Sequence, residues 1–242
     1  MNDWYVDLHS HILPGVDDGA ESAIQALSMS DAAYAEGIRV IIATPHFGLC
    51  NTGYDLDKAK VVFLDLKEDL FSCHENLQLY MGNEILYGPE TTEALKQGNA
   101  LTLAGSDYVL IEFFPGDSFS TLEKAVQSLT RAGYRPVIAH AERYECLRKH
   151  PEAVQELVHH GALIQINSSS LMKGLLDARY RFIKKLLKND LVHFLGSDCH
   201  NDSGRKPEMK AAAGKLRQLA GEIRSEKILR GNGEKLLRNE PI

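Results

Sequence analysis

The stretch LHSHILPGVDDGAES (residues 8–22) places two histidines one residue apart at the end of an apolar run, followed by a turn with two aspartates. Side chains two positions apart in a β-strand point to the same side, so His9 and His11 can direct both imidazoles to one point. This geometry suits chelation of a metal ion from a strand end. The plainer interpretation is one core histidine and ordinary turn chemistry, and the short motif alone does not decide between them.

The composition is that of an ordinary globular protein. The chain has 242 residues, of which 44% are hydrophobic and 25% charged, and α/β barrels of this length commonly form one domain, so we expect a single domain over residues 1–242. The net charge is −6 and basic residues form no long run, which predicts no nucleic-acid partner. The absence of a signal-peptide pattern or a long apolar segment predicts a cytoplasmic protein with no membrane insertion.

Apolar, β-branched segments alternate with helical patterns along the chain. The predicted strands cover residues 5–8, 40–43, 77–81, 108–112, 136–139, 162–166 and 193–195. The predicted helices cover 22–36, 57–73, 121–132, 151–159, 175–188 and 208–219, with a short helix at 90–96 and another near the C-terminus. Seven strands alternating with helices predict a parallel sheet, either a closed barrel or an open sheet. No glycine-rich nucleotide-binding motif follows a strand, which weakens the open-sheet alternative.

Six of the seven predicted strands end in side chains of metal-binding type, whereas the sixth ends in INSSS. The candidates are His9, His11, His46, Glu84, Glu112, His140, Asp198 and His200. Each alone has an ordinary explanation as a salt-bridge, capping or turn residue. The carboxyl ends of parallel barrel strands converge on one rim, however, so their shared placement indicates one metal centre. The other histidines lie on helical stretches or at a strand start and are not expected to take part: His74, His150, His159, His160 and His193.

Asp18, in the turn after the first strand, is a ninth candidate ligand. Nine ligands are too many for one ion, and a His and carboxylate set without thiolate favours Mn²⁺, Fe²⁺ or Zn²⁺. Two or three closely spaced ions suit phosphoester hydrolysis, because they polarise the phosphoryl group, acidify water and stabilise the leaving oxygen. Arg143 and Arg205 follow strand ends on the same rim, and their guanidinium groups are candidate phosphate-binding groups.

The motifs DLHSHILPGVDDGAES, ATPHF, GNEILY, HAERY and GSDCHN resemble the polymerase and histidinol phosphatase (PHP) superfamily of metal-dependent hydrolases. More narrowly, they resemble the manganese-dependent tyrosine-protein phosphatases of bacterial capsule and exopolysaccharide operons, the CpsB/YwqE type. The resemblance covers residues 7 to about 207. It implies a distorted (β/α)7 TIM-like barrel, the PHP fold, that holds three metal ions, with Mn²⁺ favoured.

The resemblance also implies a role for each candidate. One ion would be held by His9, His11, Glu84 and Asp198; Glu84 would bridge to a second ion held by Glu112 and His140; the third would be held by Asp18, His46 and His200. Arg143 and Arg205 would bind the phosphate of a phosphotyrosine in the C-terminal tail of a bacterial tyrosine autokinase that controls polysaccharide synthesis. Asp17 is left as a turn residue, so Asp17→Asn is expected to keep most of the activity.

Three alternatives remain open. CHNDSGR, from Cys199 to Arg205, matches the C-x5-R phosphate loop of thiol-based tyrosine phosphatases, although it does not explain the strand-end ligands. A metal-dependent enzyme of this kind could instead act on a small phosphate monoester such as histidinol phosphate. A non-catalytic, metal-binding regulatory module is the third alternative.

The four cysteines, Cys50, Cys73, Cys146 and Cys199, form no C-x-x-C pair and predict no zinc ribbon or disulfide framework. The oligomeric state is not predicted.

Overall fold

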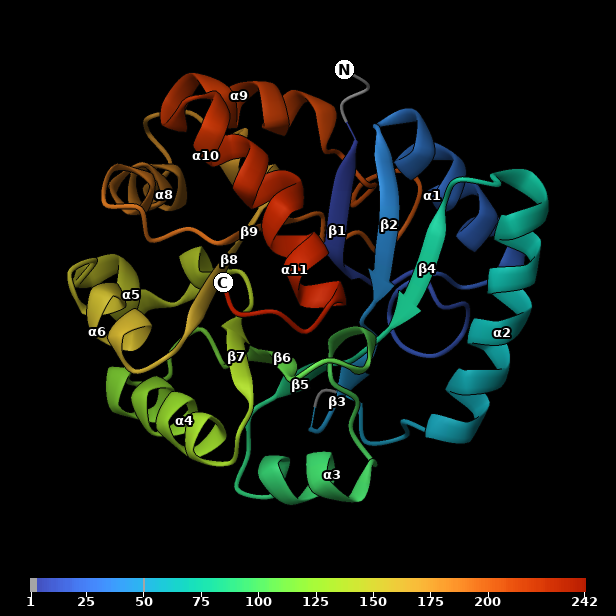
Figure 1. The fold of residues 1–242 in the computed structure, drawn as a ribbon, viewed down its shortest axis with the longest axis horizontal. Coiled ribbons are helices and arrows are strands. Elements are labelled where there is room, and N and C mark those ends of the chain that lie inside the picture. The colour runs from blue at the N-terminus through green and yellow to red at the C-terminus, as the bar shows by residue number, and fades with distance from the viewer. Residues whose placement is uncertain (1–3, 50) are drawn as a thin grey trace.

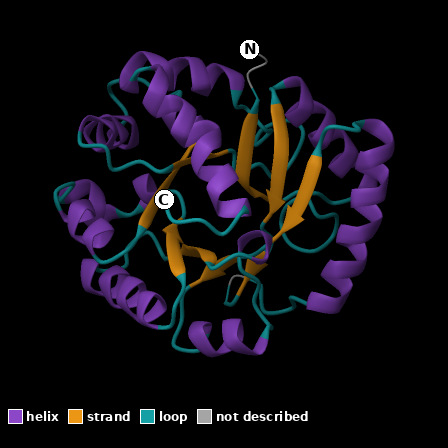
Figure 2. Ribbon diagram, viewed as in Figure 1, coloured by secondary structure: helices purple, strands orange, loops and turns teal. Residues whose placement is uncertain are grey.

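Parallel strands occupy the centre of the molecule and helices surround them (Figures 1 and 2). The computed structural model describes residues 4–49 and 51–242. The strands are β1 (Tyr5–Ser10), β2 (Ile38–Ala43), β3 (His46–Phe47), β4 (Gln78–Met81), β5 (Glu84–Leu86), β6 (Tyr108–Glu112), β7 (Arg135–Ile138), β8 (Leu163–Asn167) and β9 (Phe194–Gly196). They pair in parallel in the orders β1-β2-β4 and β3-β5-β6-β7-β8-β9. The predicted parallel α/β class is confirmed.

The helices follow one another around the strands in chain order, from α1 in blue to α9 in red (Figure 1). Their bounds are α1 (Ala23–Ala35), α2 (Leu56–Cys73), α3 (Thr91–Gln97), α4 (Phe119–Arg131), α5 (Glu145–Lys149), α6 (Ala153–His159), α7 (Ser168–Leu171), α8 (Ala178–Lys188), α9 (Lys210–Ala220), α10 (Glu222–Glu226) and α11 (Asn232–Leu237). The Ser22 and Asp55 side chains cap the first two. Gly37, Gly133 and Gly161 follow α1, α4 and α6 and have positive φ, as is common for a glycine just after a helix.

Two short strands, β3 and β5, were not predicted, and their positions matter for the site. Pro45 has no backbone N–H and interrupts the path from β2 to β3, while Gly82 and Asn83 separate β4 from β5. The two interruptions are joined because Pro45 O accepts hydrogen bonds from Glu84 N (3.2 Å) and from Asn83 Nδ2 (2.9 Å). His46 and Glu84 are therefore register partners at the starts of β3 and β5, rather than residues that follow a strand.

The inner faces of the strands change from apolar to polar along the chain direction. A buried cluster contains Leu8, Ile42, Leu110, Val137 and Phe194, one from each of five strands, together with Leu236 of α11. Further along β1, β6 and β8, and just after β9, buried positions are polar, as at His9, Glu112, Gln165, Asn167 and Asp198. Because the strands are parallel, these polar side chains collect at one end of the strand array.

The last strand also lies beside the first. Ser10 and Cys199 form a parallel bridge, Asp198 N donates to His9 O (2.8 Å), and His11 N donates to Cys199 O (2.9 Å). These bonds join β1, the first strand of one sheet, to the segment that follows β9, the last strand of the other sheet. They place Asp198 beside His9.

Cys73, Cys146 and Cys199 are free thiols, and Cys50 lies outside the described residues. Among the helices of residues 4–49 and 51–242, none combines the length and the apolar character that a membrane span requires.

Candidate metal centre

The structure brings all nine predicted ligand-type side chains together at one end of the strand array. They form four overlapping groups, within each of which the ligand atoms lie within 4.8 Å of one another. The groups are His11, Asp18, His46 and His200; His9, His11 and Glu84; His9, His140 and Asp198; and His46, Glu84 and Glu112. The five histidines expected to lie elsewhere belong to none of the groups found among the described residues.

Glu84 lies at the centre of these groups. Its Oε2 atom is 3.1 Å from His9 Nε2, 3.2 Å from His11 Nε2 and 3.3 Å from His46 Nδ1. Its Oε1 atom is 2.7 Å from His140 Nε2. Burial alone would raise the pKa of this carboxyl group, but the charges of His9 and His140 outweigh burial and hold the pKa well below its usual value. One buried carboxylate therefore contacts four imidazoles.

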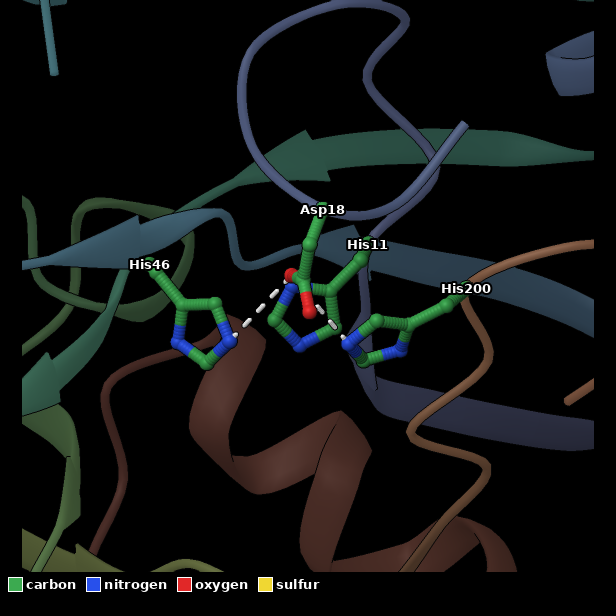
Figure 3. Close-up of side chains that lie close together, drawn as sticks. All are labelled: His11, Asp18, His46 and His200. Atoms are coloured by element: carbon green, nitrogen blue, oxygen red, sulfur yellow. Dashed lines mark ion pairs between the residues drawn. The ribbon is translucent and has the colours of Figure 1, made fainter. Parts of the chain in front are cut away.

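Asp18 makes a second contact point at the outer side of the centre (Figure 3). Its Oδ1 atom lies 3.4 Å from His46 Nε2 and 3.4 Å from His200 Nε2, and the rings of His11 and His200 lie 3.9 Å apart between their centroids. The Asp18 side chain is exposed, whereas that of His200 is buried. The turn of residues 15–19 thus places a carboxylate beside imidazoles that come from later segments of the chain.

The donor chemistry fits divalent metal ions. His9 Nε2 and His11 Nε2 face each other at 3.2 Å, and His46 Nδ1 and Glu112 Oε1 are buried atoms that lie 3.0 Å apart without hydrogen-bond geometry. Imidazole nitrogens and carboxylate oxygens directed at common points, with no thiolate among them, match the preferences of Mn²⁺, Fe²⁺ and Zn²⁺. These residues can therefore hold such ions.

Two of the nine residues have backbone conformations that are unfavourable for a side chain of their type. His140 has φ 33° and Asp198 has φ 53°, both in the left-handed region. Such residues cost about 1–3 kcal/mol each and concentrate at functional sites. At His140 and Asp198 the left-handed backbone turns the side chain toward the centre just after β7 and β9.

Asp17 was expected to be only a turn residue, and this expectation is wrong, because its side chain also holds His11. Its Oδ2 atom accepts hydrogen bonds from His11 Nδ1 (2.7 Å) and His46 N (3.0 Å), and its Oδ1 accepts from Gly19 N (3.0 Å). Burial opposes ionisation, but the hydrogen bond and charge of His11, together with the backbone N–H groups of His46 and Gly19, outweigh it, and the pKa of Asp17 falls to about 2. Asp17 therefore orients His11 so that Nε2 faces the centre. The adjacent aspartates of the motif gave no signal of which one holds the histidine.

Substitution of each aspartate tests this difference. Asp18→Asn is expected to lose one bound ion and most of the activity, because the substitution removes the charge of a candidate ligand. Asp17→Asn keeps one acceptor for His11 but cannot also accept from Gly19, so we expect metal affinity to fall about 10–100-fold. Metal content and Mn²⁺ titrations measure both effects, with the exposed Asp57→Asn as the control. Wild-type affinity in Asp17→Asn would contradict the orienting role.

The two predicted arginines meet on one ligand. Arg143 Nη2 donates to Asp198 Oδ2, and Arg205 Nη2 donates to Asp198 Oδ1 at 2.9 Å. Burial would raise the pKa of Asp198, but the charges of His9 and Arg143 lower it instead. Both guanidinium groups are partly exposed and have further N–H donors that can bind an anion.

A cavity of about 620 Å³ opens beside Asp18 and His46. It is lined by Gly15, Val16, Asp17, Asp18, His46 and Asn51. Asp18 and His46 belong both to the cavity lining and to the candidate metal centre. A ligand in this cavity would therefore reach the centre directly.

Cys199 has the wrong environment for a nucleophile. Its side chain is 3% exposed, its Sγ lies 3.2 Å from Ser10 Oγ, and burial raises the pKa of the thiol to about 12. A reactive cysteine needs a lowered pKa and access to substrate. The environment of Cys199 therefore argues against the thiol mechanism.

We expect Cys199→Ser to retain phosphatase activity within a few-fold, and a chelator to abolish it, because the metal-type ligands rather than the thiol carry the chemistry. Initial rates on a phosphotyrosine peptide before and after EDTA treatment and Mn²⁺ restoration measure this. An inactive serine variant in a folded, chelator-resistant enzyme would overturn the expectation.

Metal affinity should depend on pH. Burial favours the neutral imidazoles, but Glu84 raises the pKa of His9, and Asp17 and Glu84 raise that of His11 well above its usual value. Below these pKa values the rings hold protons that a metal must displace. Affinity is therefore expected to rise, with release of protons, as the pH increases through and above the ordinary imidazole pKa of about 6.5. Calorimetric Zn²⁺ titrations in buffers of different ionisation enthalpy measure the proton release, and a pH-independent affinity would contradict the expectation.

A parallel α/β fold with a His, Asp and Glu centre at its carboxyl strand ends defines a candidate metalloprotein of the α/β class. The chain matches the family described as capsular polysaccharide synthesis, CpsB/CapC, over residues 5–238. It is 37% identical to the tyrosine-protein phosphatase YwqE of Bacillus subtilis, over 98% of this chain and 93% of that protein. It is 33% identical to the tyrosine-protein phosphatase CpsB of Streptococcus agalactiae, over 98% of this chain and 100% of that protein.

A solved structure supports the same family assignment. It comes from work on Bacillus subtilis YwqE and Streptococcus pneumoniae CpsB, described as unique metal-dependent tyrosine phosphatases. The TM-score is 0.89 at 35% identity, with 98% of this chain and 96% of the other covered. The chain belongs to the CpsB/CapC family, as the resemblance of its motifs predicted.

Proposed function

We propose that this protein is a metal-dependent tyrosine-protein phosphatase. The observation that carries the proposal is the convergence of nine ligand-type side chains on one centre, with two arginines on the ligand Asp198. The names of the family's relatives support phosphotyrosine as the substrate class. We propose three divalent ions per chain, Mn²⁺ first among them, with His9, His11, Asp18, His46, Glu84, Glu112, His140, Asp198 and His200 as ligands.

Each part of the site has a distinct task. When bound, divalent ions supply an activated water molecule and neutralise charge on the phosphoryl group. Arg143 and Arg205 bind phosphate oxygens through the N–H groups that Asp198 leaves free. The cavity beside Asp18 and His46 receives the phosphorylated side chain. Asp17 holds His11 with Nδ1 as the donor, which leaves Nε2 free for the centre.

We also propose the form of the barrel, the number of domains and the protein substrate. Strands β2 and β3, and likewise β4 and β5, count as two interrupted strands, which reduces nine strands to seven and supports a distorted (β/α)7 barrel in a single domain over residues 1–242. We propose as the substrate the C-terminal tail of a bacterial tyrosine autokinase in the cytoplasm; the family description supports only the link to capsular polysaccharide synthesis.

Paired substrate assays test the proposed function. The metal-stripped protein, resupplied with Mn²⁺, is expected to hydrolyse a phosphotyrosine peptide with a higher kcat/KM than histidinol phosphate. A preference for histidinol phosphate would replace the proposal by the small-molecule alternative. If the metal-loaded protein hydrolyses no phosphate monoester, the proposal would be replaced by the non-catalytic, metal-binding regulatory module.

A further inference from the structure

Strand β8 supplies no ligand, yet two of its side chains contact three ligand residues. Gln165 and Asn167 lie two positions apart, are 0% and 1% exposed, and face the candidate metal centre. Gln165 Oε1 lies 2.7 Å from His140 N and 3.2 Å from His9 Nδ1. Gln165 Nε2 lies 2.8 Å from Asn167 Oδ1, and Asn167 Nδ2 lies 2.7 Å from Asp198 Oδ2.

One backbone group fixes the direction of this whole chain of hydrogen bonds. His140 N–H can only donate, so the Gln165 atom beside it must be the oxygen. That oxygen can only accept from His9, which places the proton of His9 on Nδ1 and leaves the Nε2 lone pair directed at Glu84 and His11. The Gln165 amide nitrogen must then donate to Asn167 Oδ1, so the Asn167 amide nitrogen donates to Asp198.

The packing around Gln165 supports a fixed position. A Cβ atom at Gly196 of β9 would lie 2.9 Å from Gln165 Nε2 and 3.0 Å from His9 Cβ. The glycine therefore leaves the space through which these two side chains pass. His140, whose N–H sets the direction, is held in the left-handed conformation that aims this group at Gln165.

We infer that Gln165 and Asn167 are positioning residues that set the tautomer of His9 and the orientation of Asp198, so that ligands from β1 and from the end of β9 are presented to the metal in one arrangement. The inference rests on the proposed metal centre, and it adds a role for the one strand end without a ligand. Partners that orient metal ligands typically contribute about 10–100-fold to metal affinity.

Three variants separate the two halves of this chain. Gln165→Leu removes the acceptor for His9 and the donor to Asn167. Gln165→Glu keeps the acceptor for His9 but loses the donor to Asn167. Asn167→Leu removes the donor to Asp198 and the acceptor for Gln165 Nε2, but it leaves the contact of Gln165 with His9 in place. Asn232→Leu is the matched control, because Asn232 Nδ2 donates to His193 O at the opposite end of β9.

The readouts are Zn²⁺ and Mn²⁺ affinity without substrate, and the His9 Nδ1–H signal in NMR spectra of the Zn²⁺-loaded, ¹⁵N-histidine-labelled protein. We expect Gln165→Leu to lose the signal and about 10–100-fold in affinity. Gln165→Glu should keep the signal with an intermediate affinity, and Asn167→Leu should keep the signal with reduced affinity. The Asn232→Leu control should keep both, whatever its melting temperature.

Wild-type affinity together with a retained signal in folded Gln165→Leu would overturn the inference. If that variant does not fold, wild-type affinity in Asn167→Leu would overturn it instead. Because both readouts are made with the metal alone, they do not depend on the substrate. If the wild-type protein does not hydrolyse phosphotyrosine, the proposed function would be refuted, but the effects of the variants on metal affinity and on the His9 signal would still stand.

Discussion

Glu84→Gln is expected to lose about three orders of magnitude in kcat/KM, the upper end of the effect of removing one charged group that stabilises a transition state. Glu84 contacts His9, His11, His46 and His140 through its two oxygens. A glutamine keeps the size of the side chain but has no charge and only one acceptor oxygen. The variant should also bind at least one ion fewer, which elemental analysis of the purified protein measures.

The control for this substitution is Glu123→Gln. Glu123 on α4 pairs with His160 and is partly buried, but it lies outside the metal centre. It should keep the metal content and the activity of the wild type. A Glu84→Gln protein with full metal content and wild-type turnover would show that this carboxylate is not the shared ligand.

Arg143→Lys is expected to lower kcat/KM about 100-fold while the metal content stays unchanged. Lysine keeps the charge, but it lacks the planar fork that can contact Asp198 and a phosphate oxygen at the same time. In the proposed function both arginines act on the same phosphate, so Arg143→Lys combined with Arg205→Lys should deviate from additivity. Steady-state kinetics on a phosphotyrosine peptide, together with the affinity for inorganic phosphate, measure these effects.

Arg131→Lys on α4 serves as the matched control, because the Arg131 side chain is exposed and donates a hydrogen bond to Gln127, away from the metal centre. It should leave the kinetics unchanged. If Arg143→Lys instead lost metal with normal phosphate affinity in the remaining loaded fraction, Arg143 would hold Asp198 rather than substrate.

Much of the fold could be predicted because its signals are local. The seven predicted strands coincide with observed strands to within two residues at each end, since each is a short apolar, β-branched run between helical patterns. The two- and three-residue strands β3 and β5 are too short to show a period. Their existence depends on the hydrogen bonds of Pro45 O to Glu84 and Asn83, which join segments about 40 residues apart.

The candidate ligands could be predicted for a related reason. Parallel strands bring their carboxyl ends together, so ionisable side chains at those ends had to meet. The residues that orient these ligands could not be predicted from the sequence. Gln165 and Asn167 are amides in a serine-rich strand end and carry no metal-binding signature, and Gln165 reaches His9 across 156 positions of sequence. Asp17 differs from Asp18 only in which way the turn directs its side chain.

Stepwise reloading of the metal-stripped wild-type protein with Mn²⁺ tests whether bound metal is responsible for hydrolysis, with bound ions and phosphotyrosine hydrolysis measured on the same samples. We expect no hydrolysis without metal, and full activity only when about two to three ions are bound per chain, the number that the ligand set can hold. Full hydrolysis by protein free of divalent metal, or saturation with ions and no hydrolysis, would contradict this expectation.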